Sequence, residues 1–277
     1  MSGKKTRLYI LSNGFIENDV ALNLLLHNQA TIDEPNKPAE WHRVPSICLL
    51  IEHPKLGWVL VDTGSSKDAL NGGWPEAALK GSPPFRTEAD LLEARLASVG
   101  VKPADIDWLV ITHLHIDHAG GLELFSGTKA GSRVIVHEQE LKQALYSVFV
   151  RNEAFSNAYW RRDFVGLPGI AFEPVQGDTE LADDLTLLWL PGHTAGLLGV
   201  MLHLENTGTH IFMSDAAYVS GNYGPPARLP GILYDSVACL NSIERVRWLQ
   251  RRYDATVLFG HDAEQFKTLK LAPEYYD

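Results

Sequence analysis

Between residues 108 and 121 the chain reads Trp108-Leu109-Val110-Ile111-Thr112-His113-Leu114-His115-Ile116-Asp117-His118-Ala119-Gly120-Gly121. The first five residues form a short, continuously apolar run, which is typical of a strand covered on both faces of a sheet. Three imidazoles and a carboxylate follow within six residues. They cannot all pack in a core, because each buried imidazole needs a polar partner and a buried carboxylate needs pairing. A Zn²⁺-like ion satisfies them, since it accepts neutral imidazole nitrogen and carboxylate oxygen at roughly 2.0–2.2 Å.

The spacing within this segment indicates two ions. His113 and His115 alternate across one residue, so on an extended loop they can hold the same ion. Asp117 and His118 come after a turn and face a different point, which suggests a second ion. The pair Gly120-Gly121 is expected to let the backbone turn tightly and begin the next helix.

Three further polar residues follow predicted strands. His193 comes after 185–190, Asp215 after 210–213 and His261 after 256–259. A single histidine at a strand end is usually structural, so the prediction depends on all three lying at the same edge as the first cluster. Asp215 can then bridge two zinc-type ions, which at about 3.5–4 Å apart share a water and lower its pKa toward 7.

Strands and helices alternate along the chain, which places the chemistry in a crevice at the carboxyl edge of the strands. We predict an α/β fold in a single domain, residues 1–277. The expected strands are 7–12, 46–62 with a turn at 54–57, 108–112, 133–136, 185–190, 198–204, 210–214 and 256–260. The expected helices are 87–99, with Thr87 as N-cap, 138–164 and 236–252.

Composition excludes several classes of function. The net charge is −10 and the positive residues are scattered, whereas a nucleic-acid groove needs clustered Lys and Arg. No apolar run approaches the roughly 18 residues of a membrane span, and 8–11 is too short for a secretory signal. Cys48 and Cys239 are expected to be small buried hydrophobic residues, which fits a reducing cytoplasm. A small or neutral substrate is expected.

The ligand pattern resembles the metallo-β-lactamase superfamily, an αβ/βα sandwich of four layers. Val61-Asp62-Thr63-Gly64 is similar to an early turn of that fold, in which the Asp lies behind the metal ligands. The closer resemblance is to the N-acyl homoserine lactonases, which quench quorum sensing. It is carried by the segments 214–218 and 259–266, and by 27–32 and 223–226, which look like longer members of that branch. Ile116 replaces an aromatic residue of some lactonases, which leaves the preferred acyl chain open.

This resemblance implies roles for individual residues. His113, His115 and His193 would hold the first metal, Asp117, His118 and His261 the second, and Asp215 would lie between them. A metal-bridging hydroxide would attack the lactone carbonyl. Tyr218 would stabilise the oxyanion, and Asp117 would carry a proton to the leaving oxygen. Two divalent ions are implied, with zinc expected and iron or cobalt as alternatives, and the assembly is either a monomer or a homodimer.

Opening the ring of a neutral amphiphile requires an apolar groove beside the metals. The candidates for this groove are Phe15, Ile16, Val20, Leu22, Leu25, Phe149, Phe155 and Tyr159. Hydrolysis of another lactone, a thioester or an organophosphate on the same fold remains an alternative. A glutathione thioesterase would need a basic clamp, and the only cluster is Arg245, Arg247, Arg251 and Arg252 on a helix. A binding protein on an inactive metal fold would have lost ligands, and all seven are present.

Overall fold

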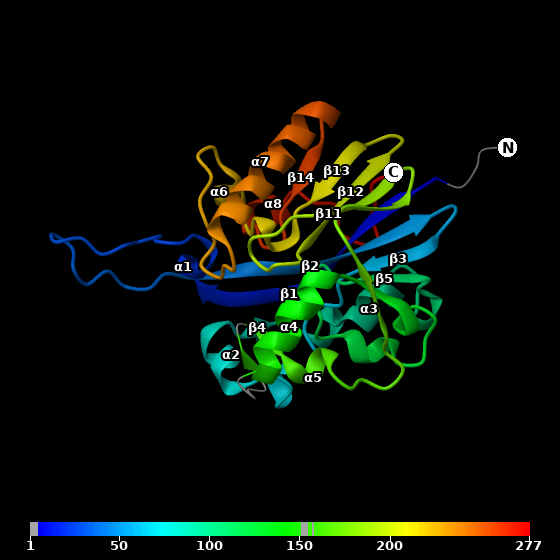
Figure 1. Ribbon diagram of the computed structural model, residues 1–277, viewed down its shortest axis with the longest axis horizontal. Coiled ribbons are helices and arrows are strands. Elements are labelled where there is room, and N and C mark those ends of the chain that lie inside the picture. Colours follow the sequence, from blue (N-terminus) through cyan, green and yellow to red (C-terminus); the bar gives the residue numbers. More distant parts are fainter. Residues whose placement is uncertain (1–4, 151–154, 157) are drawn as a thin grey trace.

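Two β-sheets lie face to face in the computed structural model, and helices cover their outer faces (Figure 1). The structure describes residues 5–150, 155–156 and 158–277. The first sheet has the strand order β4-β1-β2-β3-β5-β6-β9, the second has the order β10-β11-β12-β13-β14, and β7 and β8 form a separate two-stranded sheet. The strands are β1 (Arg7–Asp19), β2 (Trp41–His53), β3 (Gly57–Val61), β4 (Pro84–Phe85), β5 (Trp108–Val110), β6 (Val134–His137), β7 (Phe155–Ser156), β8 (Tyr159–Trp160), β9 (Phe172–Val175), β10 (Thr179–Ala182), β11 (Leu185–Trp189), β12 (Leu198–Leu204), β13 (Gly208–Phe212) and β14 (Thr256–Leu258). The helices are α1 (Val20–Asn23), α2 (Glu76–Gly81), α3 (Leu92–Ala97), α4 (Glu138–Val150), α5 (Arg161–Phe164), α6 (Ser220–Tyr223), α7 (Ser236–Tyr253) and α8 (Ala263–Phe266).

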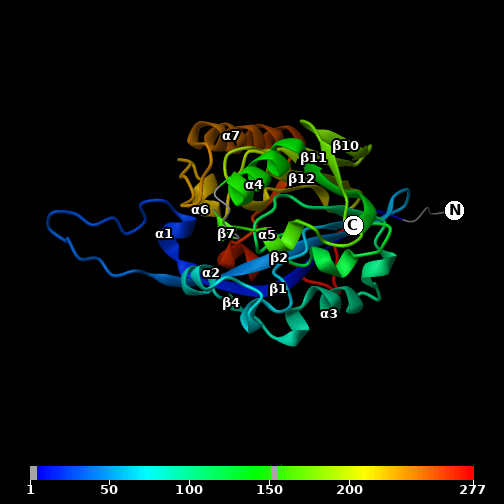
Figure 2. The same ribbon diagram turned by 60° about the horizontal axis from the view of Figure 1, so that its bottom comes forward.

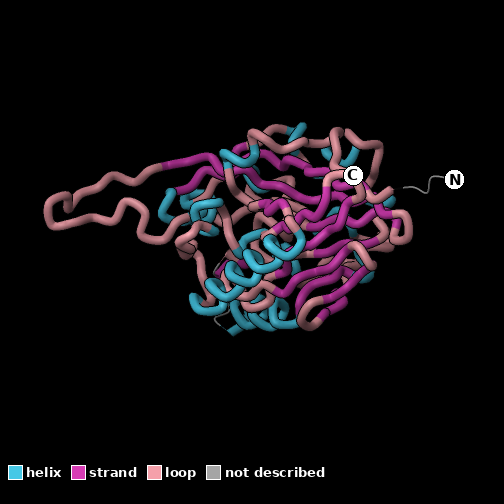
Figure 3. The backbone as a smooth tube through the Cα atoms, turned by 90° about the horizontal axis from the view of Figure 1, so that it is seen from above, coloured by secondary structure: helices cyan, strands magenta, loops and turns pink. Residues whose placement is uncertain are grey.

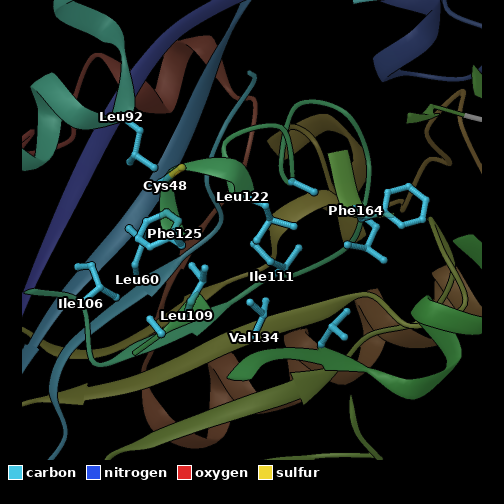
Figure 4. Packing of buried hydrophobic residues seen from close by; sticks show 14 of the residues in the cluster. Cys48, Leu60, Leu92, Ile106, Leu109, Ile111, Leu122, Phe125, Val134 and Phe164 are labelled. Carbon is cyan, nitrogen blue, oxygen red and sulfur yellow. The ribbon is translucent and has the colours of Figure 1, made fainter. Parts of the chain in front are cut away.

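Three apolar cores define the layers of the fold. Between the sheets, Ile10 and Leu49 of the first sheet pack with Leu187 and Val200 of the second. The outer face of the first sheet packs against α3 and α4, in a core that includes Leu60, Leu109 and Phe125 (Figure 4). On the outer face of the second sheet, α7 buries Cys239, Ile243 and Val246. The predicted four-layer αβ/βα sandwich is therefore confirmed, and both cysteines are buried and free.

Strand direction brings several loops to one edge of the sandwich. Strands β3, β5 and β6 are parallel, so their carboxyl ends lie at the same edge. In the second sheet β11 and β13 are both antiparallel to β12, and β14 is parallel to β13, so these three strands also end together. The segments that follow β5, β11, β13 and β14 are the ones that carry the predicted metal ligands. In Figure 2, α7 lies on one side of the two sheets and α3 on the other.

Two predicted helices differ from the structure. In the predicted helix 87–99, residues Glu88–Asp90 form a 3-10 turn, and the α-helix begins only at Leu92. Thr87 and Asp90 do form the capping box that is expected at the start of a helix. The prediction of a helix over 138–164 is confirmed over α4 and over the one turn of α5, but it is wrong at 155–156 and 159–160, which are strands. Residues 151–154 and 157 lie outside the described part. Strands β7 and β8 pair with each other, and Ala158 O accepts from Ile116 N at 3.0 Å. This segment therefore forms its own hairpin and bonds to a loop that is distant in sequence.

A long loop, residues 24–40, extends away from the sandwich (Figure 3). Ile32 in this loop is 95% exposed. Within the described residues, no helix is both long and apolar enough to cross a membrane.

Candidate metal centre and substrate cavity

The structure brings together all seven side chains that the sequence predicted as metal ligands. They come from four segments at one edge of the sandwich, and all except the partly exposed Asp117 are buried. Their nitrogen and oxygen atoms form three overlapping groups of possible ligands. The groups are His113, His115 and His193; His113, His118 and Asp215; and Asp117, His118 and His261.

Asp215 lies between two sets of imidazoles. Its Oδ2 atom is 3.7 Å from His113 Nε2 and 3.5 Å from His193 Nε2. Its Oδ1 atom is 3.3 Å from both His118 Nε2 and His261 Nε2. Each oxygen of one carboxylate thus faces a different pair of rings, which is the arrangement of a ligand shared by two ions.

The donor atoms fit the geometry of zinc-type ions. Tetrahedral bonds of roughly 2.0–2.1 Å place neighbouring donors about 3.3 Å apart, close to the distances around Asp215 Oδ1. The Nε2 atoms of His113 and His118 and the Oδ1 atom of Asp215 are buried and have no hydrogen-bond partner among the described residues. Buried polar atoms without a partner are costly, and metal ions bound at the centre would satisfy all three.

Hydrogen bonds behind the rings orient four of the imidazoles. His113 Nδ1 contacts Thr112 Oγ1 at 3.1 Å, and His118 Nδ1 contacts Asp62 Oδ2 at 2.9 Å. His193 Nδ1 and His261 Nδ1 donate to the backbone oxygens of residues 232 and 45 at 3.0 and 2.8 Å. With Nδ1 engaged in this way, Nε2 points to the centre with a free lone pair, as metal-binding histidines require. His115 instead presents Nδ1, which lies 2.9 Å from His193 Nε2.

Protonation of the centre follows from burial and from its own charges. Burial, together with the neighbouring His118 and His115, holds the pKa of His113 well below its ordinary value, so the ring is neutral. Burial opposes ionisation of Asp215, but the attraction of His118 and His261 is stronger and holds its pKa well below the ordinary value. Burial also opposes the charged forms of His118 and His261, but the charge of Asp215 outweighs it and raises the pKa of both rings, so without a metal they favour the protonated form. Because imidazole binds metal in its neutral form, metal binding here would release protons from these rings.

Asp62 supports the centre from behind, as the resemblance of its turn to the metallo-β-lactamase fold implied. It has a φ of 64°, a left-handed conformation uncommon for a residue with a side chain. Its Oδ1 accepts from Thr112 N at 2.7 Å, and its Oδ2 accepts from Thr112 Oγ1 at 2.8 Å in addition to His118. One buried carboxylate therefore fixes both the strand end and a ring of the centre.

The two glycines at 120 and 121 serve close packing. A Cβ at Gly120 would lie 2.4 Å from Ser66 N, and one at Gly121 would lie 2.5 Å from Thr63 O. Neither has a positive φ. A 3-10 helix, Leu122–Phe125, does follow, but the reason for glycine is the close approach of the 63–66 turn.

Sequence reasoning missed Glu140, which lies behind the centre. It is fully buried although it belongs to a helix whose sequence suggests a solvated face. Its Oε1 accepts from Leu114 N and from the hydroxyl of Tyr159, each at 2.9 Å. The Tyr159 ring packs edge-on against His115, with ring centroids 4.6 Å apart. Glu140 thus holds the loop that carries the first two histidines, and no local pattern reveals this.

Tyr218 lies at the centre with its hydroxyl close to the ligands. Its ring packs against His193 and His261, with centroids 5.3 Å away in each case. Burial, reinforced by the charge of Asp215, raises the pKa of Tyr218 well above its ordinary value, so the hydroxyl keeps its proton. His193 Nδ1 is 3.2 Å from the hydroxyl oxygen and also donates to the residue 232 carbonyl. The tyrosine oxygen therefore accepts at this contact, and its own hydrogen remains available as a donor.

A cavity of about 210 Å³ opens onto the centre. Asp117, Asp215, Tyr218 and His261 form its polar end. Of the residues predicted for an apolar groove, Ile16, Leu22 and Phe155 line it. The others do not line this cavity, and the buried Tyr159 packs behind His115 instead. The rest of the apolar wall was not predicted, because it comes from distant segments; it includes Val44, Trp74, Ala78, Ile116 and Ile232.

The sequence model of the metallo-beta-lactamase superfamily matches residues 43–261 of this chain. The chain belongs to the metallo-beta-lactamase superfamily. Within it, the chain is 33% identical to the N-acyl homoserine lactonase AiiB of Agrobacterium fabrum, over 95% of this chain and 96% of the relative. It is 30% identical to an N-acyl homoserine lactonase of Bacillus cereus, over 90% of this chain and 93% of the relative.

Solved structures of this superfamily agree with the fold. A variant of AiiA from B. thuringiensis with N-decanoyl-L-homoserine bound at the active site superposes with a TM-score of 0.81 at 27% identity, over 99% of this chain and 100% of that chain. An N-acyl homoserine lactone hydrolase with N-hexanoyl-L-homoserine bound at its catalytic metal centre also superposes with a TM-score of 0.81, at 26% identity, with the same coverage of both chains.

Proposed function

We propose that this chain opens the lactone ring of N-acyl homoserine lactones at a dinuclear metal centre and thereby quenches quorum sensing. The observation that carries the proposal is the position of Asp215, whose two oxygens face different pairs of imidazoles beside an apolar cavity. The relatives named N-acyl homoserine lactonase support the substrate class.

We assign the ligands in two sets. His113, His115 and His193 hold the first ion, Asp117, His118 and His261 hold the second, and Asp215 is shared between them. Zinc is our proposed metal, because imidazole and carboxylate donors at this spacing suit it, and iron or cobalt would bind similar donors. When bound, the two ions would supply a hydroxide at neutral pH and would stabilise negative charge on oxygen.

The chain's own residues orient the substrate and move protons. Tyr218 donates its hydroxyl hydrogen to the lactone carbonyl oxygen as negative charge develops there, which is the function of an oxyanion donor. Asp117 lies at the polar end of the cavity, with Oδ2 3.7 Å from His118 Nε2 and 3.8 Å from His261 Nε2. We assign it the transfer of a proton to the ring oxygen as the ester bond breaks.

Two of the four arginines of α7 are not available for the basic clamp of a glutathione thioesterase. Arg245 donates to Trp189 O and pairs with Asp178. Arg247 donates to Tyr223 O and pairs with Glu244. Both guanidinium groups already have partners, so neither is free to clamp the carboxylate of a glutathione adduct.

The test is a hydrolysis panel with metal-loaded protein. We expect turnover of N-hexanoyl- and N-decanoyl-homoserine lactone, measured as the protons released by ring opening. These rates should be well above the rates for a simple phenyl ester, a glutathione thioester and a phosphotriester. The metal-stripped protein is the control. Preferential hydrolysis of the thioester or the phosphotriester would overturn the assignment in favour of the corresponding alternative.

We further propose one domain over residues 1–277, a cytoplasmic location and a homodimer. The single domain is supported by the hydrogen bond from Leu198 N to Thr112 O at 2.9 Å, which joins the two sheets. The cytoplasmic location is supported by the two free cysteines, and the homodimer by the exposed Ile32 on the extended loop.

A further inference from the structure

Two carboxamides interrupt the apolar wall of the cavity. Asn18 lies at the end of β1 and Asn23 at the end of α1, and each is only 5% exposed. Both line the cavity that opens onto the metal centre. A groove that bound only unsubstituted acyl chains would not need these carboxamides. Burying them is also unfavourable unless they are hydrogen-bonded.

The two side chains hold each other in place but keep donors free. Asn23 Nδ2 donates to Asn18 Oδ1 at 2.8 Å, and Asn18 Nδ2 lies 3.5 Å from Asn23 Oδ1. Asn222 Nδ2 donates to Asn23 O at 2.9 Å and fixes α1 in this position. Each carboxamide carries two N–H hydrogens. Within the described part of the chain, neither Nδ2 atom has a side-chain or backbone acceptor besides its partner in the pair.

Strand register gives the distance of this pair from the centre. Pro45 O accepts from the ring of His261, and Pro45 lies opposite Phe15 in the β1–β2 pairing. Asn18 lies three residues further along β1, opposite His42. At about 3.3 Å per residue, the pair is roughly 10 Å from the point at which the strands contact the centre.

That distance suits a group on the acyl chain beyond its amide. In an N-acyl homoserine lactone the amide carbonyl carbon is three bonds from the lactone carbonyl carbon, about 3.5 Å when extended. An oxygen on C3 of the acyl chain is three bonds further, at roughly 7 Å. With the lactone carbonyl held at the metal centre, the C3 oxygen extends further along β1 than the amide does.

We propose that Asn18 and Asn23 select acyl chains that carry an oxygen on C3, so that 3-oxo- and 3-hydroxyacyl homoserine lactones are the preferred substrates. This inference rests on the proposed lactonase function. The free N–H groups of the pair donate to the C3 oxygen. An unsubstituted chain covers the same N–H groups without an acceptor, which disfavours it.

The expected preference is moderate. A site built around a hydrogen bond can reject an analogue that lacks the polar atom by several orders of magnitude, whereas a purely apolar pocket discriminates far less. The pair here is already partly satisfied by its own hydrogen bonds, so the loss on binding an unsubstituted chain is smaller. We expect kcat/KM for N-(3-oxooctanoyl)-homoserine lactone to exceed that for N-octanoyl-homoserine lactone by about tenfold.

The test compares three substrates of one chain length, unsubstituted, 3-hydroxy and 3-oxo, on the metal-loaded protein. The double variant Asn18→Leu/Asn23→Leu removes both polar groups at once, so that neither is left unpaired. Its ratio of 3-oxo to unsubstituted kcat/KM should fall to about one, because the 3-oxo chain loses its hydrogen bonds and the unsubstituted chain no longer covers N–H groups without an acceptor. Ser82→Ala is the matched control, because Ser82 is a half-buried polar residue on the same cavity, and it should keep the parent ratio.

The outcomes separate failure of the selectivity inference from failure of the proposed function. A ratio near one in the parent protein overturns the selectivity inference and leaves the lactonase function standing, even where the double variant does not fold. A ratio that stays unchanged in a folded double variant, or that is lost in Ser82→Ala instead, also overturns it. If no homoserine lactone is hydrolysed by the metal-loaded parent, the proposed function itself fails.

Discussion

Replacing Tyr218 by Phe removes one hydrogen-bond donor and leaves the ring in place. The ring is buried between His193 and His261, and phenylalanine can keep both contacts. At the His193 contact the hydroxyl oxygen is an acceptor at 3.2 Å, and His193 Nδ1 has a second acceptor, the backbone oxygen of residue 232, at 3.0 Å. The substitution therefore leaves His193 oriented.

The magnitude follows from the charge that the hydroxyl would stabilise. Loss of one oxyanion donor costs roughly 2.7–4 kcal/mol in sites where hydrogen bonds alone stabilise the charge. Here bound ions would share that charge, so we expect on the order of 1–2 kcal/mol, or about 5- to 30-fold in kcat/KM. The metal content should be unchanged, because Tyr218 is not assigned as a ligand.

The assay measures kcat/KM for N-hexanoyl- and N-decanoyl-homoserine lactone together with metal per chain. Tyr159→Phe is the matched control, because Tyr159 is also buried near the first ligand set but donates its hydroxyl to Glu140, away from the cavity. The control should lose about 1 kcal/mol of stability, the usual contribution of one hydrogen bond, without a comparable loss of rate at saturating metal. Parent rates for both lactones in Tyr218→Phe would refute the assignment of an oxyanion donor.

Three other perturbations give distinct outcomes. Chelation should abolish turnover and lower the melting temperature, because a ligand that binds only the native state stabilises it, and active protein without metal by elemental analysis would contradict this. Asp215→Ala should reduce occupancy of both sites, whereas His193→Ala should chiefly reduce one; equal loss of one ion in both variants would exclude a shared carboxylate. Burial raises the pKa of Asp163 to about 8 against the opposing charge of Arg162. The folded protein therefore holds this proton after the unfolded chain has released it, so stability should fall as pH rises from about 4 to 8. Asp163→Asn should flatten that slope in denaturant titrations, and an unchanged slope would show that Asp163 is ionised in the folded protein.

Most of the fold, and the side chains that meet at the candidate metal centre, could be predicted from the sequence. A buried strand followed by His113, His115, Asp117 and His118 is unusual enough to predict a metal site, since these side chains have no other arrangement that satisfies them. The strands before His193, Asp215 and His261 were predicted from their apolar runs, and these three residues were added to the site because they follow strand ends. Residue type and spacing do not determine long-range pairing, and so the predicted helix over 138–164 is confirmed in α4 and α5 but wrong at the strands β7 and β8. The segment around Ala158 instead bonds to the loop at Ile116.

Only the tertiary structure decided how these residues act together. It placed the two oxygens of Asp215 between separate pairs of rings, and it buried Glu140 behind His115, where a helical position in the sequence suggests solvent. It also assembled the cavity wall from β1, α1, β2 and α2, where the pair of Asn18 and Asn23 meets the apolar residues. The physical reason is that residue type and local spacing determine which side chains need a partner, whereas the pairing of strands distant in sequence determines which partner each one meets.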